Sequence, residues 1–172
     1  MKNFSATILR CAIFVAFICV TICSCTDSAA DPFAYVDSPF DVVVDGKVNG
    51  IIFTAKAHCD FTPRNTDEAI ITAEITSPPS LEGIIIKRLA DGRNVTTLDN
   101  VEEYGVCFDA ILDALMLLSI TDNYSKIEKN GNTTVYHFNS DQNEIKYIFR
   151  NGCALPEKIS GKGVSLALTP LK

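Results

Sequence analysis

The stretch 106–120, with the sequence VCFDAILDALMLLSI, decides which fold the rest of the chain can adopt. Its apolar residues recur at intervals of three and four, which is the spacing of one helical face. Asp109 and Asp113 lie four residues apart, close to the opposite face. We therefore predict an amphipathic helix of about four turns. Its apolar stripe consists of Cys107, Ile111, Ala114, Leu115 and Leu118.

On both sides of this helix, apolar and polar residues alternate with a period of two, as they do in half-buried strands. Asp45-Gly46, Asp91-Gly92 and Asn130-Gly131 separate neighbouring stretches, and such dipeptides favour tight hairpin turns. The pattern predicts about five strands before the helix and about four after it. These strands are expected at 40–44, 51–59, 69–76, 83–89, 94–98, 124–128, 133–138, 144–150 and 164–168.

The number of strands limits how a single helix can bury the apolar face of the sheet. A sheet with one apolar face needs a second layer, and one helix cannot cover so many strands if they lie flat. We therefore expect an α+β fold in which a mostly antiparallel, strongly curved sheet, a half-barrel of about 8–9 strands, is wrapped around one central α-helix. The expected domain covers residues 40–172, with its helix near 106–120.

The middle of the chain carries a family resemblance. The turn SPPSLEG at 77–83 is followed by a hairpin through Asp91-Gly92 and by the helix at 110–118. This order of elements resembles the LolA/LolB/LppX family of lipoprotein-handling and lipid-carrying proteins. The resemblance implies a bent antiparallel sheet over helices with an apolar cavity between them. The chain has fewer helices than those carriers, and no functional residue of the family can be transferred to it.

The N-terminal residues 1–24 have the three parts of a secretory signal: a basic start with Lys2 and Arg10, an apolar run, and a small residue before a cysteine. The apolar run is shorter than the roughly 20 residues that a membrane span needs. At 22–25 the sequence ICSC resembles a lipobox, which implies cleavage before Cys25 and attachment of diacylglycerol to it. Cys23 is the weaker candidate, because an isoleucine would then stand where the motif has a small residue. Residues 25–39 are expected to form a tether.

A diacylglyceryl group on Cys25 would anchor the protein in the cell membrane, on its extracytoplasmic face. The membrane is therefore the first expected partner. Without Lys2 and Arg10, 13 basic residues remain against 21 acidic ones, a net charge of −8. Phosphate backbones repel such a surface, so nucleic acid is excluded as an expected partner.

Few residues of the mature chain could carry chemistry. His58 and Cys59 are adjacent, but neighbouring strand residues point to opposite faces, so they are not expected to meet. We expect His137 to be a packed or half-exposed side chain. Cys59, Cys107 and Cys153 are expected to be small and buried, with a disulfide between two of them as the alternative. We find no catalytic set, cofactor motif or metal-ligand spacing, so we expect a protein that is not an enzyme and needs no cofactor or metal.

Two functions remain open. The first is a binding module that holds a lipid or another apolar ligand in the concave face of the sheet. The second is a structural or protein-interaction lipoprotein of the cell envelope with a filled core, which meets a partner protein through its acidic outer face or a sheet edge. An internal apolar cavity would favour the first function. The residues expected to line that cavity are Ile84, Ile86, Ile111, Leu115 and Leu118.

Overall fold

The computed structural model describes residues 31–62, 65–105, 108–140 and 143–171. The predicted signal at 1–24, Cys25 and Cys107 lie outside the described residues. The chain divides into two units, Met1–Asp31 and Pro32–Lys172, and the second is the folded unit considered below. Within the described part, no helix has the length and apolar character that crossing a membrane requires.

The folded unit has six strands, then one short helix, then five strands. The first half contains η1 (Ala34–Asp37), β1 (Phe40–Val48), β2 (Ile51–Cys59), β3 (Ala69–Ser77), β4 (Ile85–Leu89), β5 (Asn94–Leu98) and β6 (Val101–Tyr104). The helix α2 (Asp109–Met116) continues into η2 (Leu117–Ser119). The second half contains β7 (Tyr124–Asn130), β8 (Thr133–Ser140), β9 (Asn143–Arg150), β10 (Lys158–Gly161) and β11 (Val164–Pro170).

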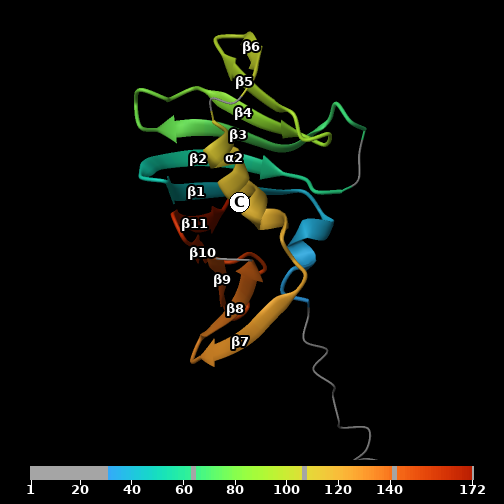
Figure 1. The fold of residues 1–172 in the computed structure, drawn as a ribbon, viewed down its shortest axis with the longest axis vertical. Coiled ribbons are helices and arrows are strands. Elements are labelled where there is room, and N and C mark those ends of the chain that lie inside the picture. Colours follow the sequence, from blue (N-terminus) through green and yellow to red (C-terminus); the bar gives the residue numbers. More distant parts are fainter. Residues whose placement is uncertain (1–30, 63–64, 106–107, 141–142, 172) are drawn as a thin grey trace, which may run out of the picture. The chain divides into compact units, whose positions relative to one another are not determined.

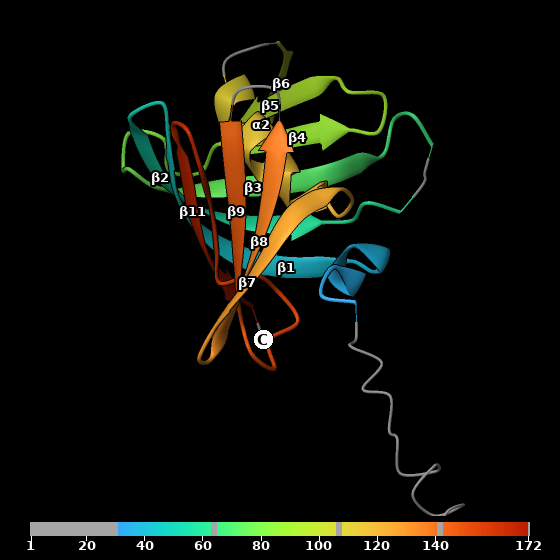
Figure 2. The ribbon, with the colours of Figure 1, turned by 60° about the horizontal axis from the view of Figure 1, so that its bottom comes forward.

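These strands form one sheet of 11 strands, in the order β6-β5-β4-β3-β2-β1-β11-β10-β9-β8-β7 (Figure 1). Each half of the chain is an antiparallel meander, and the two meanders join where β1 pairs with β11. The sheet is strongly twisted: in Figure 2, β8 and β9 run across the direction of β1, β3 and β4. Since β6 and β7 are the two edge strands, the helix that links them has to cross the sheet from one edge to the other.

The expected α+β half-barrel of about 8–9 strands around a central helix is wrong. The strands form a single open sheet of 11 strands whose edges, β6 and β7, stand at opposite ends of the strand order. The prediction missed β6 and β10, which have four residues each. Strands this short hardly establish a period of two. The helix is also shorter than predicted, since α2 has eight residues.

The first hairpin turns at a different place from the one predicted. Strand β1 continues through Asp45-Gly46, and the turn is formed by Asn49 and Gly50, whose φ angles are 49° and 89°. Gly46 lies opposite Phe53, and a Cβ atom on Gly46 would stand 2.3 Å from the Phe53 ring. Gly46 is therefore present to make room for an aromatic ring rather than to turn the chain.

The hydrophobic core lies on the face of the sheet that carries α2, called here the helix-bearing face. Strand β2 alternates as the sequence predicted, with Phe53, Ala55, Ala57 and Cys59 buried. The opposite face, called the outer face, carries the intervening polar residues of the strand, such as His58. The core side of the helix consists of Ile111, Leu112, Ala114 and Leu115.

The segment before β1 belongs to the folded unit. Phe33 is 2% exposed, and its ring packs edge-on against Tyr136, Phe138, Tyr147 and Phe149 at centroid distances of 5.2–5.9 Å. The folded unit therefore includes residues 32–39, which the sequence pattern had assigned to the tether.

Two buried tyrosines hold the C-terminal end of the helix. The Tyr35 hydroxyl donates a hydrogen bond of 2.9 Å to the carbonyl of Leu118, and the Tyr147 hydroxyl donates one to the carbonyl of Leu117. The Leu117 carbonyl also accepts a backbone hydrogen bond from Ile120, so the two tyrosines add side-chain donors to the carbonyls at this end of the helix. Burial raises the pKa of both tyrosines, so they remain protonated donors.

Candidate functional site

The structure places the five predicted lining residues in or against the packed core. Ile86, Ile111, Leu115 and Leu118 are each at most 2% exposed, and Ile84 is half-buried against the same core. None of the five lines the groove described next. They were predicted as lining because an apolar residue that faces a cavity and one that faces a packed layer look alike in sequence.

An open groove lies beside the helix, on the flank that faces β9, β10 and β11. The helix packs on β1, β3 and β4, and this position leaves space beside it of about 420 Å³. Binding sites for small ligands have volumes of about 300–1,000 Å³ and mostly apolar walls. We call this space the helix-side groove. Its apolar walls include Val48, Ala110, Ala114, Leu117, Ile145 and Val164.

Small residues on the helix create the groove. Ala110 and Ala114 lie four residues apart, and therefore on one flank of the helix, where they fill little space. Asp113, which borders the same groove, forms an ion pair with Arg88 of β4 and so links the helix to the first meander. The alanine pair was visible in the sequence, but the flank it faces depends on where the helix crosses the sheet.

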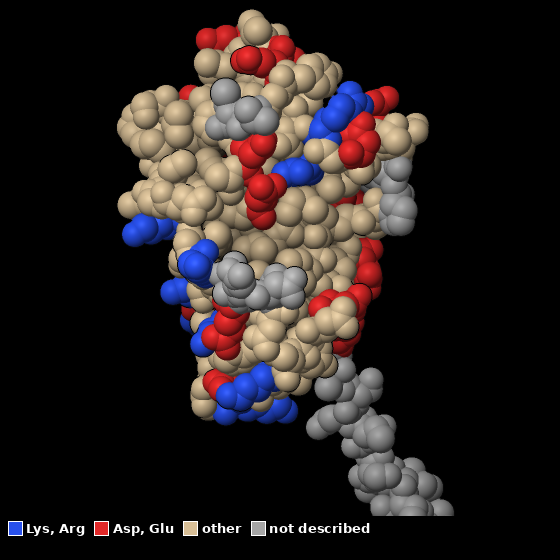
Figure 3. Space-filling view, in the orientation of Figure 1, with Lys and Arg blue, Asp and Glu red and all other residues tan. Residues whose placement is uncertain are grey.

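Charged groups stand at the border of the groove. Lys162, in the turn between β10 and β11, lines the groove and is exposed. Among the described residues it has no carboxylate partner. Asp113 also lines the groove, but it is neutralised by Arg88. Figure 3 shows the face that carries the helix: acidic atoms lie over the helix, and most of the surface beside them is uncharged.

The two histidines lie on the outer face. His58 is exposed, its Nδ1 is 2.8 Å from Asp41, and Cys59 faces the core, so His58 and Cys59 do not meet, as predicted. His137 is 4% exposed, and its Nδ1 lies 2.5 Å from Glu144. This hydrogen bond, together with one from Lys146, lowers the pKa of Glu144. In the described part of the chain, no three His, Cys, Asp or Glu side chains gather as a metal site would require.

The prediction of three buried cysteines is wrong for Cys153, which is exposed in the loop before β10. Cys59 is buried, and both thiols are free. Burial in the core, with a smaller contribution from Asp41, raises the pKa of Cys59 from its ordinary 9.0 to about 12.

This raised pKa predicts a loss of stability in alkaline solution. Above about pH 9 the Cys59 thiol ionises in the unfolded chain but stays protonated in the folded one, so rising pH favours unfolding. We expect the free energy of unfolding to fall by roughly 1.4 kcal/mol per pH unit from this group between about pH 9 and 12. Tyr35 and Tyr147, whose pKa values are also raised, act in the same direction.

Urea unfolding between pH 8 and 11 would measure the effect. The Cys59→Ala variant should lose stability less steeply with pH than the wild type, whereas Cys153→Ala should follow the wild type. Equal slopes for the wild type and Cys59→Ala would contradict the prediction.

Comparisons with known proteins add little to this geometry. No family model matches the chain, and no curated protein matches it. An uncharacterized conserved protein from Thermus thermophilus is similar in structure, with a TM-score of 0.47 and 15% sequence identity. The match covers 85% of this chain and 87% of that one. By its fold and groove, this is a small protein with an open antiparallel sheet and a groove beside its helix.

Proposed function

We propose that this protein is a lipid-anchored binding module on the extracytoplasmic side of the cell membrane, and that it holds one acyl chain in the helix-side groove. The observation that carries the proposal is the groove itself, which is open and lined mainly by apolar side chains. The lipobox-like ICSC at 22–25 supports the anchor, with diacylglycerol on Cys25. The order of elements resembles that of lipid carriers, which agrees with an apolar ligand.

The chemistry of the groove favours an acyl chain with an anionic head. A methylene chain gains about 0.8 kcal/mol for each CH₂ removed from water. Ala110, Ala114 and Leu117 offer such a surface along one side, and Ile145 and Val164 along the other. Lys162 lines the groove and can pair with the carboxylate of such a ligand, whereas Asp113 is already paired with Arg88.

A bulky substitution in the groove tests the proposal. The full chain, purified in a mild detergent, is incubated with deuterated palmitic acid and analysed by native mass spectrometry. We expect one palmitate per chain, besides any covalently attached lipid. Ala110→Trp should reduce this occupancy at least about tenfold because the indole fills the groove, which corresponds to about 1.4 kcal/mol.

The matched control is Ala167→Trp. Ala167 is exposed on β11 between the buried residues Leu166 and Leu168, and so faces away from the helix. The control should bind palmitate like the wild type. Absence of bound palmitate in the wild type, or equal binding by the two tryptophan variants, would contradict the proposal.

The second candidate is the structural or protein-interaction lipoprotein of the cell envelope, and the edges of the sheet favour it. All four residues of β6 are exposed, and Val101 and Tyr104 are 69% and 62% exposed. An unpaired edge strand with exposed apolar residues can accept a strand of another protein. If the palmitate experiment fails, crosslinking in intact cells from a photoreactive residue at position 101 would test this candidate, with a discrete adduct to one envelope protein as the expected result.

A further inference from the structure

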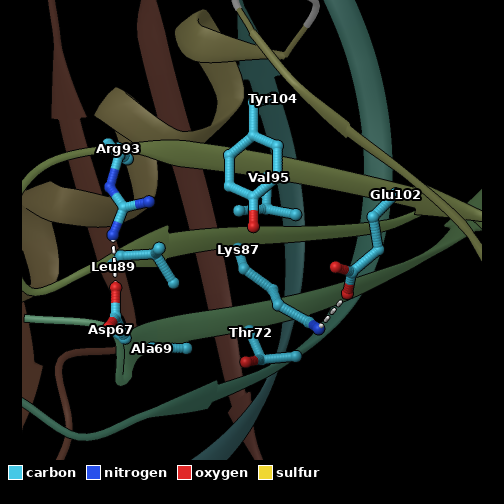
Figure 4. Close-up of a pocket in the computed structure, with 9 residues that line it drawn as sticks. All are labelled: Asp67, Ala69, Thr72, Lys87, Leu89, Arg93, Val95, Glu102 and Tyr104. Carbon is cyan, nitrogen blue, oxygen red and sulfur yellow. Dashed lines mark hydrogen bonds and ion pairs between the residues drawn. The ribbon is translucent and has the colours of Figure 1, made fainter.

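A second cavity lies on the outer face of the sheet, over β3, β4, β5 and β6 (Figure 4). Its volume is about 630 Å³. The face is settled by the strand register, since Thr72 lies opposite Lys87, Lys87 opposite Val95, and Val95 opposite Tyr104. Residues directly opposite one another point to the same side of a sheet. We call this cavity the outer-face pocket.

The floor of the outer-face pocket is apolar although it lies outside the core. Leu89 and Val95 are 7% and 3% exposed, yet neither belongs to the hydrophobic cluster under the helix. Ala69 joins them because the register of β3 shifts between Ala69 and Ile71, so that Ala69 lies opposite Leu89. In a strictly alternating strand Ala69 would lie on the same face as Ile71. The bulge therefore adds a third small apolar surface to this floor.

One aromatic ring stands beside this floor. Tyr104 is 62% exposed, and the Arg93 guanidinium lies 5.9 Å from its ring centroid. Figure 4 shows the ring beside Val95, with its hydroxyl towards the centre of the pocket. A tyrosine so placed offers an apolar ring face and a polar tip to the same ligand.

The charged side chains that line the pocket, two basic and two acidic, are paired with one another. Lys87 lies 3.5 Å from Glu102, and Arg93 lies 2.5 Å from Asp67. Arg93 also pairs with Asp91, which does not line the pocket. An anionic ligand would have to displace these carboxylates, and a cationic ligand would have to displace the basic groups. The pocket therefore favours a ligand without net charge that both donates and accepts hydrogen bonds.

We propose that the outer-face pocket binds a neutral sugar ring of a polysaccharide, with a C–H face of the ring on Tyr104 and its hydroxyls on the paired side chains. A sugar ring matches both parts of this site. Its axial C–H groups are apolar and can pack on the Tyr104 ring, and the hydroxyls at its edge can reach the paired charged side chains. The carboxylates of Asp67 and Glu102 can accept hydrogen bonds from these hydroxyls, and Arg93 and Lys87 can donate to them. The pocket lies on the face opposite the helix-side groove, so the proposal is independent of the acyl-chain function.

Calorimetric titration of the full chain in detergent with cellotetraose, maltotetraose and tetra-N-acetylchitotetraose tests the proposal. We expect binding of at least one of these neutral tetrasaccharides, with an affinity that is nearly independent of salt because no net charge is involved. Tyr104→Ala should weaken it at least about tenfold, while Tyr104→Phe, which retains the ring face, should stay within about threefold.

Two variants serve as controls. Val101→Ala changes an exposed residue of the same strand that does not line the pocket, so it should bind like the wild type. Ala110→Trp, which blocks the groove, should also leave sugar binding unchanged, so the two proposals can fail separately. The proposal is overturned if none of the three sugars binds, if Tyr104→Ala binds as well as the wild type, or if inorganic phosphate displaces the sugar.

Discussion

Replacing Cys25 by alanine is expected to abolish incorporation of lipid into the protein in bacterial cells. The sequence ICSC at 22–25 resembles a lipobox, and lipid attachment requires the cysteine thiol itself. Cells expressing the wild type and grown with an alkyne analogue of palmitic acid should yield a labelled protein after coupling to a fluorophore. For Cys25→Ala we expect the label to fall at least about tenfold, since no second lipid attachment site is predicted.

Other cysteines provide the matched controls for this experiment. Cys153→Ala removes an exposed thiol of the folded unit, and Cys23→Ala removes the competing cysteine of the motif. Both variants should be labelled like the wild type. A mature wild-type protein that begins at any residue other than an acylated Cys25, or a label that persists in Cys25→Ala, would refute the anchor.

Replacing Phe33 by alanine is expected to lower the free energy of unfolding by about 3–5 kcal/mol, the usual cost of truncating a buried aromatic residue. The Phe33 ring contacts the rings of Tyr136 and Phe138 on β8 and of Tyr147 and Phe149 on β9. Its removal would leave a cavity among four side chains that belong to the second meander. Denaturation by urea, followed by circular dichroism, would measure the change.

Asp37→Ala is the control for this prediction, because Asp37 is exposed in the same segment. We expect its effect to stay within about 0.5 kcal/mol. If Phe33→Ala were as stable as Asp37→Ala, residues 32–39 would behave as the tether that their composition suggested, and the packing seen in the structure would be unimportant for stability.

Local patterns predicted most individual elements of this protein. The strand at 51–59 and the hairpin through Asp91-Gly92 are confirmed, and a helix lies within the predicted 106–120. These features depend on neighbouring residues alone, because alternation and helical spacing are properties of a short segment. The first hairpin was misplaced because Asp45-Gly46 and Asn49-Gly50 both have turn composition. The structure distinguishes them, because Gly46 lies inside the ladder against the Phe53 ring whereas Asn49 and Gly50 have positive φ angles.

The candidate site was harder to predict than the strands. Ile86, Ile111 and Leu115 have the apolar character of lining residues, but they face a packed layer. Ala110 and Ala114 line the groove because the helix lies over the first meander and leaves the ends of β9–β11 uncovered. A side chain's neighbours across such a gap come from distant parts of the chain, so no local pattern identifies them.

The sequence by itself determined which segments form strands and which one forms a helix. On most strands it also determined which residues face the core, since both follow from the spacing of apolar residues. It also contains the lipobox-like ICSC at 22–25, whose role stays a prediction. Only the tertiary structure decided that the sheet stays open with 11 strands, that Phe33 joins the core and that a bulge turns Ala69 to the outer face. The physical reason is that each of these outcomes depends on close packing between segments far apart in the chain, where the volume and shape of the partner decide what fits.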